Sequence, residues 1–61
     1  MNVELPSATK KRLASRVRAV GVRQAAREIG CNQGTLARAL AGLRIQYATA
    51  ALIEQKVQAE Q

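Results

Sequence analysis

The residues of this chain that could do chemistry are bases and side-chain amides rather than acids or thiols. Ten of the 61 residues are Lys or Arg and four are Asp or Glu, while His is absent and Cys31 is the single cysteine. General acid–base catalysis needs positioned titratable pairs, and structural zinc needs four Cys or His ligands. The sequence therefore predicts no enzyme activity, no metal, no cofactor and no disulfide scaffold.

Positive charge is concentrated in one part of the chain. Nine of the ten basic residues lie between Lys10 and Arg44, where Glu28 is the only acid, so nine bases against one acid give this segment a charge of +8. The tail from residue 45 onward carries one Lys against two Glu. This distribution is typical of a body that binds a polyanion, although charge also keeps an Ala-rich surface soluble.

Short helices must position these groups. Two segments, 8–20 and 22–29, each carry three apolar residues at the i, i+4, i+7 spacing of one helix face. These are Leu13, Val17 and Val20 in the first segment and Val22, Ala26 and Ile29 in the second. Gly21 and Gly30 follow the two segments, as expected where a chain leaves a helix in a left-handed conformation. Ser7 is expected to cap the first helix.

Two further helices are predicted, over residues 33–41 and 49–59. Asn32 precedes the first of these helices and Thr49 is the first residue of the second, and each is expected to be the N-cap of its helix. The third helix is expected to bury one apolar stripe before Gly42 ends it. That stripe consists of Leu36, Leu40 and Leu43.

Residues 43–47 alternate apolar and polar side chains, so they could form a strand or a loop. No linker or repeat divides the chain, and the sequence predicts one all-α domain over 1–61, a small bundle of about four helices. Residues 1–6 lack the features of a secretory signal, and no stretch approaches the roughly 20 apolar residues that cross a bilayer. A cytoplasmic protein without a membrane partner is expected.

The segment from Gln24 to Leu40, QAAREIGCNQGTLARAL, joins two of these helices by a very short turn. Ala26 is small enough to lie where two helices cross, and Gly30 can take the positive φ that the turn needs. Ile29 and Leu36 are spaced to close a core beneath the turn. The segment resembles the helix-turn-helix of phage Cro and repressor proteins, and equally that of Fis and the resolvases. The resemblance implies a second helix that lies in the major groove of DNA.

Residues at and near the start of that second helix are expected to read bases. Gln33 and Asn32 can offer a donor and an acceptor to adenine, and Arg38 can reach guanine with two hydrogen bonds. Small residues beside Arg38 would let the backbone approach the groove floor, with Ala41 also turned outward. The predicted base-reading residues are Asn32, Gln33, Gly34, Ala37 and Arg38. Alternatives stay open, since Asn32 could only cap the helix, Gln33 could be solvated and Arg38 could contact phosphate.

Contacts to the DNA backbone are expected from residues that flank the reading helix. These are Arg23, Gln24, Arg27, Thr35 and Arg44, with Lys10 and Lys11 as further candidates. The run Lys10, Lys11 and Arg12 could equally be solvated. Cys31 follows the turn glycine and is expected to be a small, partly buried hydrophobe rather than a redox sensor.

The last predicted helix carries a wider apolar face than a three-helix unit needs to cover. A homodimer with twofold symmetry is therefore predicted, reading a palindromic operator with half-sites about one helical turn apart. Its predicted contact residues are Tyr47, Leu52, Ile53 and Val57. The alternative is that this stripe packs on the first helix. The chain lacks the C-terminal strands of Cro and the dimerisation helices of Fis, so their dimer geometry is not carried over.

The function that these features favour is sequence-specific binding of double-stranded DNA by a transcriptional regulator, like a phage or plasmid repressor that acts by occupying an operator. One alternative is an architectural DNA-binding protein that resembles Fis and bends DNA. Another is a module whose basic helices bind an acidic protein partner. A helix bound to a membrane surface is less favoured because no Trp or Phe could anchor it. No small-molecule substrate is expected.

Overall fold

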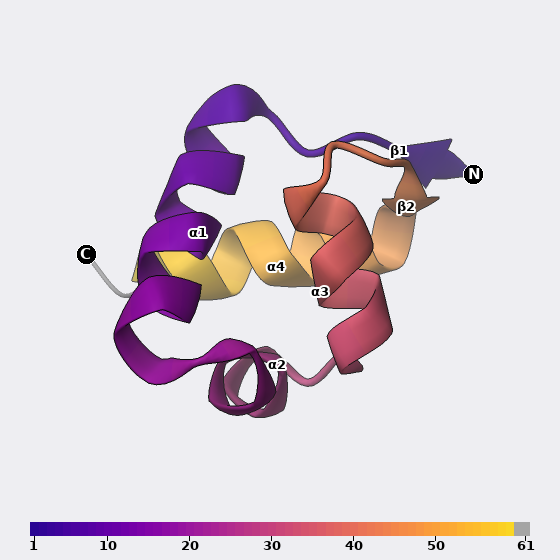
Figure 1. The fold of residues 1–61 in the computed structure, drawn as a ribbon. Helices are drawn as coiled ribbons and strands as arrows, with labels where there is room; N and C mark the ends of the chain where they lie inside the picture. The colour runs from indigo at the N-terminus through magenta and orange to yellow at the C-terminus, as the bar shows by residue number, and fades with distance from the viewer. Residues whose placement is uncertain (60–61) are drawn as a thin grey trace.

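Four helices and one short β-sheet make up the part of the chain that the structure describes, residues 1–59 (Figure 1). In this computed structural model the helices are α1 (Ser7–Val20), α2 (Val22–Ile29), α3 (Gln33–Leu40) and α4 (Tyr47–Ala59). Strand β1 (Asn2–Val3) pairs antiparallel with β2 (Ile45–Gln46), with Asn2 opposite Gln46 and Val3 opposite Ile45. The predicted fold class, a small all-α bundle, is confirmed.

The first helix begins one residue earlier than expected. Pro6, with φ −59° and ψ 152°, stands at the N-cap, and its carbonyl oxygen accepts a hydrogen bond from the Lys10 N–H at 2.9 Å. No side chain caps α1, so the prediction that Ser7 caps it is wrong. Proline holds φ near the value that a helix entrance needs, which lets Ser7 enter the first turn.

Glycines end the first two helices as predicted. Gly21 has a positive φ of 90°, but its ψ of 155° lies outside the left-handed helical region that was predicted; its N–H donates to the Val17 carbonyl oxygen at 2.7 Å. Gly30 is left-handed as predicted, with φ 93° and ψ 26°, and its N–H donates to the Ala26 carbonyl oxygen at 2.8 Å. Residues with a Cβ resist a positive φ, which explains why glycine occupies both positions.

The segment between α3 and α4 settles the open question about residues 43–47. Ile45 and Gln46 form β2, and Tyr47 is already the first residue of α4. Thr49 therefore lies inside the helix, and its predicted role as N-cap is wrong. The Tyr47 N–H donates to the carbonyl oxygen of Met1 at 2.8 Å, so the start of α4 is linked to strand β1 rather than to a local capping side chain.

One buried side chain from each of three helices forms the centre of the core. Leu13 of α1, Leu36 of α3 and Ile53 of α4 are fully buried. In Figure 1, α4 runs behind α1 and α3 and α2 closes one end of the bundle. No helix among residues 1–59 combines the length and the apolar character needed to span a membrane.

Leu43 is not part of this core. The prediction that it belongs to the buried stripe of α3 is wrong, because the helix ends at Leu40 and the Leu43 side chain is 55% exposed. Leu40 is partly buried, and Ala39 is fully buried in the stripe with Leu36. An alanine there lets α3 approach its neighbours closely.

Candidate nucleic-acid interface

Helices α2 and α3 are joined by a turn of three residues, Gly30, Cys31 and Asn32. Hydrogen bonds to residues nearby in the sequence hold this turn in place. The N–H groups of Gly30 and Cys31 both donate to the Ala26 carbonyl oxygen, at 2.8 and 3.1 Å, and close the end of α2. The Oδ1 atom of Asn32 accepts the Thr35 N–H at 2.7 Å and caps α3. The predicted cap at Asn32 and the left-handed turn at Gly30 are both confirmed.

The outer face of α3 carries the residues that were predicted to turn outward. Gly34, Ala37, Arg38 and Ala41 are all exposed. Three of these four side chains are hydrogen or methyl, so another molecule could approach the α3 backbone closely, and Arg38 is the one long side chain among them. Their predicted orientation is confirmed, whereas their role in reading bases stays a prediction.

Asn32 and Gln33 are exposed at the start of α3, but they are not equally free. The Asn32 oxygen accepts the Thr35 N–H, and this bond holds the Asn32 amide in the capping position, whereas the Gln33 amide makes no hydrogen bond within residues 1–59. A two-bond contact with adenine needs both a donor and an acceptor. Gln33 is therefore the better candidate for such a contact.

Basic side chains lie beside the first turn of α3. Arg23 and Arg27 of α2 line an open groove of about 500 Å³ together with Asn32 and Gln33. Both arginines are exposed. Two of the residues that were predicted to contact the DNA backbone are thus close to two of the residues that were predicted to read bases.

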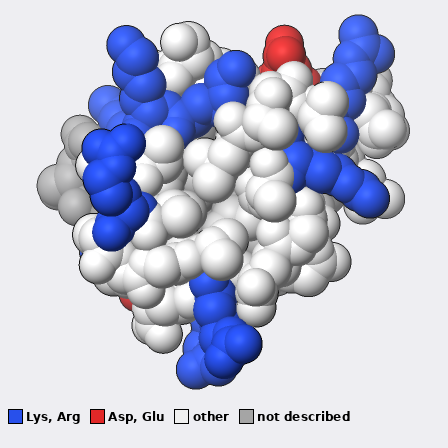
Figure 2. All heavy atoms as spheres, viewed as in Figure 1, with Lys and Arg blue, Asp and Glu red and all other residues white. Residues whose placement is uncertain are grey.

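Further cations lie beside the other end of α3. The Lys10 Nζ and Glu4 Oε2 atoms are 3.6 and 3.8 Å from the position that a Cβ on Gly42 would occupy, so the start of α1 meets the end of α3 and the Lys10 cation has an acid near it. Arg44 is exposed just beyond that end, and Lys11 is exposed on α1. Figure 2 shows Lys and Arg side chains around the periphery of the face that carries α1 and α3, with few acidic groups among them.

Glu28, the single acid of the basic segment, is neutralised by an ion pair that links α1 to α2. Arg16 donates from Nε and Nη2 to the two carboxylate oxygens at 2.9 and 2.8 Å. The Gln24 amide also donates to Glu28, at 3.3 Å. These bonds, those from Arg16 foremost, lower the pKa of Glu28 below its ordinary value. Gln24, a predicted backbone contact, therefore also has a partner within the fold.

The Arg16–Glu28 pair was not anticipated from the sequence. The two residues are 12 positions apart and belong to different helices, so no helical spacing of three or four residues marks them as partners. Only the packing angle of α1 against α2 brings them together.

Cys31 is partly buried against the core, as predicted. Burial raises the pKa of its thiol, because the thiolate is poorly solvated there. The thiol is thus protonated near neutral pH and has the character of a small apolar group. Among the described residues, no group of three or more His, Cys, Asp or Glu could hold a metal ion.

The predicted dimer contacts divide into two groups. Ile53 and Val57 are 0% and 5% exposed within the single chain, so the prediction that they contact a second copy is wrong. They pack in the protomer core, which was the alternative, because α4 lies across the inner side of α1. Leu52 is partly buried against the same core. Tyr47 is 61% exposed and is the one of the four that remains largely on the surface.

Comparison with known proteins adds no assignment: no family model, no curated protein and no solved structure matches the chain.

Proposed function

We propose that this protein binds double-stranded DNA in a sequence-specific manner through α3, and that it regulates transcription by occupying an operator. The observation that supports this is the placement of cations at both ends of the exposed α3 face. Arg23 and Arg27 lie beside its first turn, and Lys10 and Arg44 lie near its last. We further propose a cytoplasmic protein encoded by a bacterium, a phage or a plasmid.

Each part of this surface has a role in the proposed complex. The small outer residues of α3 let the helix lie deep in the major groove, where Arg38 donates to guanine and Gln33 pairs with adenine. The flanking cations contact phosphates, which supplies affinity but no sequence information. The Arg16–Glu28 pair supports the proposal in a different way, since the one acid in this segment has its counter-charge within the fold.

A homodimer on a palindromic operator belongs to the same proposal. One domain of this size makes few phosphate contacts, and a second copy doubles them. With Ile53 and Val57 inside the protomer, exposed Tyr47 is the remaining predicted contact of this dimer, with Leu52 partly available.

The test is selection of preferred duplexes from a random pool, followed by titration of the wild type, Arg38→Ala and Arg18→Ala. Arg18 is exposed on α1 and carries the same charge, which makes it a matched control. Loss of a two-bond contact to guanine costs about 1–3 kcal/mol, so Arg38→Ala should weaken the preferred site roughly tenfold to hundredfold and relax preference at one base pair. Equal losses in both variants, or no preferred sequence in the selection, would reject specific readout by Arg38.

A second candidate function is architectural binding with little sequence preference. It is favoured by one feature, which is that Gly34, Ala37 and Ala41 offer no polar side chain to a base edge. In that case Arg38→Ala would lower affinity by a similar small factor on every duplex. The bend that an architectural protein imposes on DNA would be detected by energy transfer between the two ends of a labelled duplex.

A further inference from the structure

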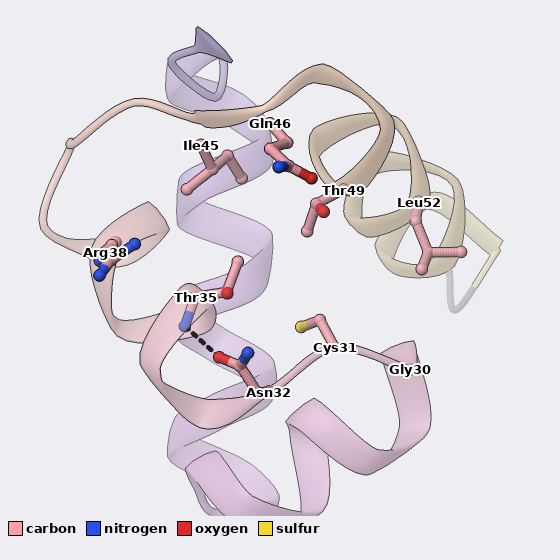
Figure 3. Close-up of a pocket in the computed structure, with 9 residues that line it drawn as sticks. All are labelled: Gly30, Cys31, Asn32, Thr35, Arg38, Ile45, Gln46, Thr49 and Leu52. Atoms are coloured by element: carbon pink, nitrogen blue, oxygen red, sulfur yellow. Dashed lines mark hydrogen bonds between the residues drawn. The ribbon is translucent and has the colours of Figure 1, made fainter. Parts of the chain in front are cut away.

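A second groove runs along α3, between this helix and the start of α4 (Figure 3). It has a volume of about 600 Å³. Asn32, which caps α3, lines one side with Thr35 and Arg38 of the helix, at a spacing of three residues. Gln46, Thr49 and Leu52 line the other side at the same spacing. The remaining lining residues are Gly30, Cys31 and Ile45.

The groove is lined by hydrogen-bond donors and by no acid. Thr35 and Thr49 contribute hydroxyl groups, Gln46 contributes an amide and Arg38 a guanidinium group. Figure 3 shows Thr35, Gln46 and Thr49 directed into the same space. Neither the Gln46 amide nor the Thr49 hydroxyl makes a hydrogen bond within residues 1–59, so both are available to an acceptor from outside.

This groove and the groove beside the α2 arginines meet at Cys31 and Asn32, which line both, and they separate to different flanks along α3. Successive residues of an α-helix are about 100° apart, so Gln33 and Thr35 point roughly 200° apart around the axis. Gln33 lines the groove that contains Arg23 and Arg27, and Thr35 lines the groove that contains Gln46 and Thr49. A helix in the major groove has a phosphate backbone on each side. The α2 arginines can contact the phosphate backbone of one DNA strand, and the groove between α3 and α4 can contact that of the other strand.

We propose that the groove between α3 and α4 binds the phosphodiester backbone of that other strand, and that Gln46 and Thr49 are DNA-contacting residues. Their side chains donate hydrogen bonds to phosphate oxygens, next to Thr35, while Arg38 keeps its proposed contact with guanine. This inference rests on the proposed DNA-binding function and adds to it a second clamp, formed by neutral donors from β2 and α4. None of the sequence patterns marked these two residues as DNA contacts, because they follow the helix-turn-helix segment and carry no charge.

The experiment compares Gln46→Ala, Thr49→Val and the double variant with two controls, Gln55→Ala and Ser15→Ala. The control residues are an exposed amide on α4 and an exposed hydroxyl on α1, and neither lines the groove. Affinity is titrated on the selected duplex and on an unrelated duplex at several salt concentrations. Circular dichroism on each variant checks that the fold is retained.

We expect each groove variant to weaken binding roughly tenfold to hundredfold on both duplexes, since one hydrogen bond to a charged group is lost. The slope of log Kd against log salt should stay that of the wild type, because a neutral donor releases no counterion. Arg27→Ala, in contrast, should reduce that slope by about one. A neutral methylphosphonate at the contacted phosphate should abolish the difference between wild type and the double variant.

Three outcomes are distinguishable. If the wild type binds no duplex, the proposed function fails and this inference fails with it. If the wild type binds and the groove variants match Gln55→Ala and Ser15→Ala, the function stands and the groove assignment is overturned. If the losses occur only on the selected duplex, Gln46 and Thr49 contact bases, and the assignment to the backbone is overturned.

Discussion

Glu28 accepts hydrogen bonds from Arg16 and Gln24, and its pKa gives the fold a dependence on pH. Hydrogen bonds from Arg16, and then from Gln24, lower the pKa of this carboxyl below its ordinary value of 4.5. As the pH falls, the Glu28 carboxylate of the unfolded chain therefore binds a proton at a higher pH than that of the folded chain does. The pair therefore stabilises the fold above that ordinary value, and its contribution is lost as the pH falls through the pKa of the folded state.

We expect Glu28→Gln to remove this dependence. Thermal unfolding midpoints measured from about pH 7 to about pH 3 should fall more steeply for the wild type than for Glu28→Gln, and the two curves should converge at the acidic end. Glu54→Gln is the control, because Glu54 forms no ion pair within residues 1–59. Parallel curves for wild type and Glu28→Gln over the whole range would show that the Arg16–Glu28 bond does not contribute to stability.

At the scale of elements, the turn between α2 and α3 depends on the left-handed backbone of Gly30. A Cβ added there would have only the Leu52 Cδ2 atom nearby, at 3.9 Å, so the space is open and the obstacle is the φ of 93°. Gly34, in contrast, lies inside α3, where a Cβ would be 3.4 Å from the Asn32 Oδ1 atom, which is an ordinary contact. The two glycines thus provide a matched pair.

Gly30→Ala should destabilise the protein by about 1–2 kcal/mol, because a residue with a Cβ is strained in this conformation. For a domain of this size that corresponds to a fall in Tm of roughly 4–16 °C. Gly34→Ala should leave Tm unchanged or raise it slightly, since alanine favours a helix more than glycine does. Thermal unfolding followed by circular dichroism measures both. Similar losses in the two variants would mean that the conformation of Gly30 is not the cause.

At the scale of the whole molecule, the structure reverses two predictions, since Ile53 was expected to contact a second copy and Leu43 to be buried. Ile53 is fully buried in the protomer, where it contributes to a core shared by several helices, and Leu43 is 55% exposed. If Ile53 belongs to the protomer core, its truncation must affect folding itself. If it were a dimer contact, the variant would be a folded monomer.

We expect Ile53→Ala to cost about 2–5 kcal/mol. A domain this small rarely has more than about 3–5 kcal/mol of stability, so the variant should be largely unfolded at every protein concentration. Leu43→Ala should change stability by less than about 0.5 kcal/mol. Circular dichroism and sedimentation velocity, each at several concentrations, measure fold and oligomeric state. A helical, monomeric Ile53→Ala protein would contradict the burial of Ile53 in the protomer.

Much of the local structure follows from neighbouring residues and could be predicted from the sequence. Apolar spacing predicts the four helices, glycine at position 30 predicts the left-handed turn, and Asn32 is suited to cap the helix that follows it. The outward face of α3 follows from the same periodicity. Each of these features depends on side chains within one or two helical turns, so its cause is contained in a short segment of sequence.

The tertiary structure decided what depends on residues far apart in the chain. Strand β1 pairs with β2, and the Met1 carbonyl oxygen receives the N–H that opens α4, so the helix begins at Tyr47 and not at Thr49. The packing of α4 against α1 buries Ile53 within the protomer. The approach of β2 and α4 to α3 also creates the groove of Gln46 and Thr49. The helix and strand propensities of the sequence are compatible with several ways of packing these elements together. The burial of one shared hydrophobic core selects among them.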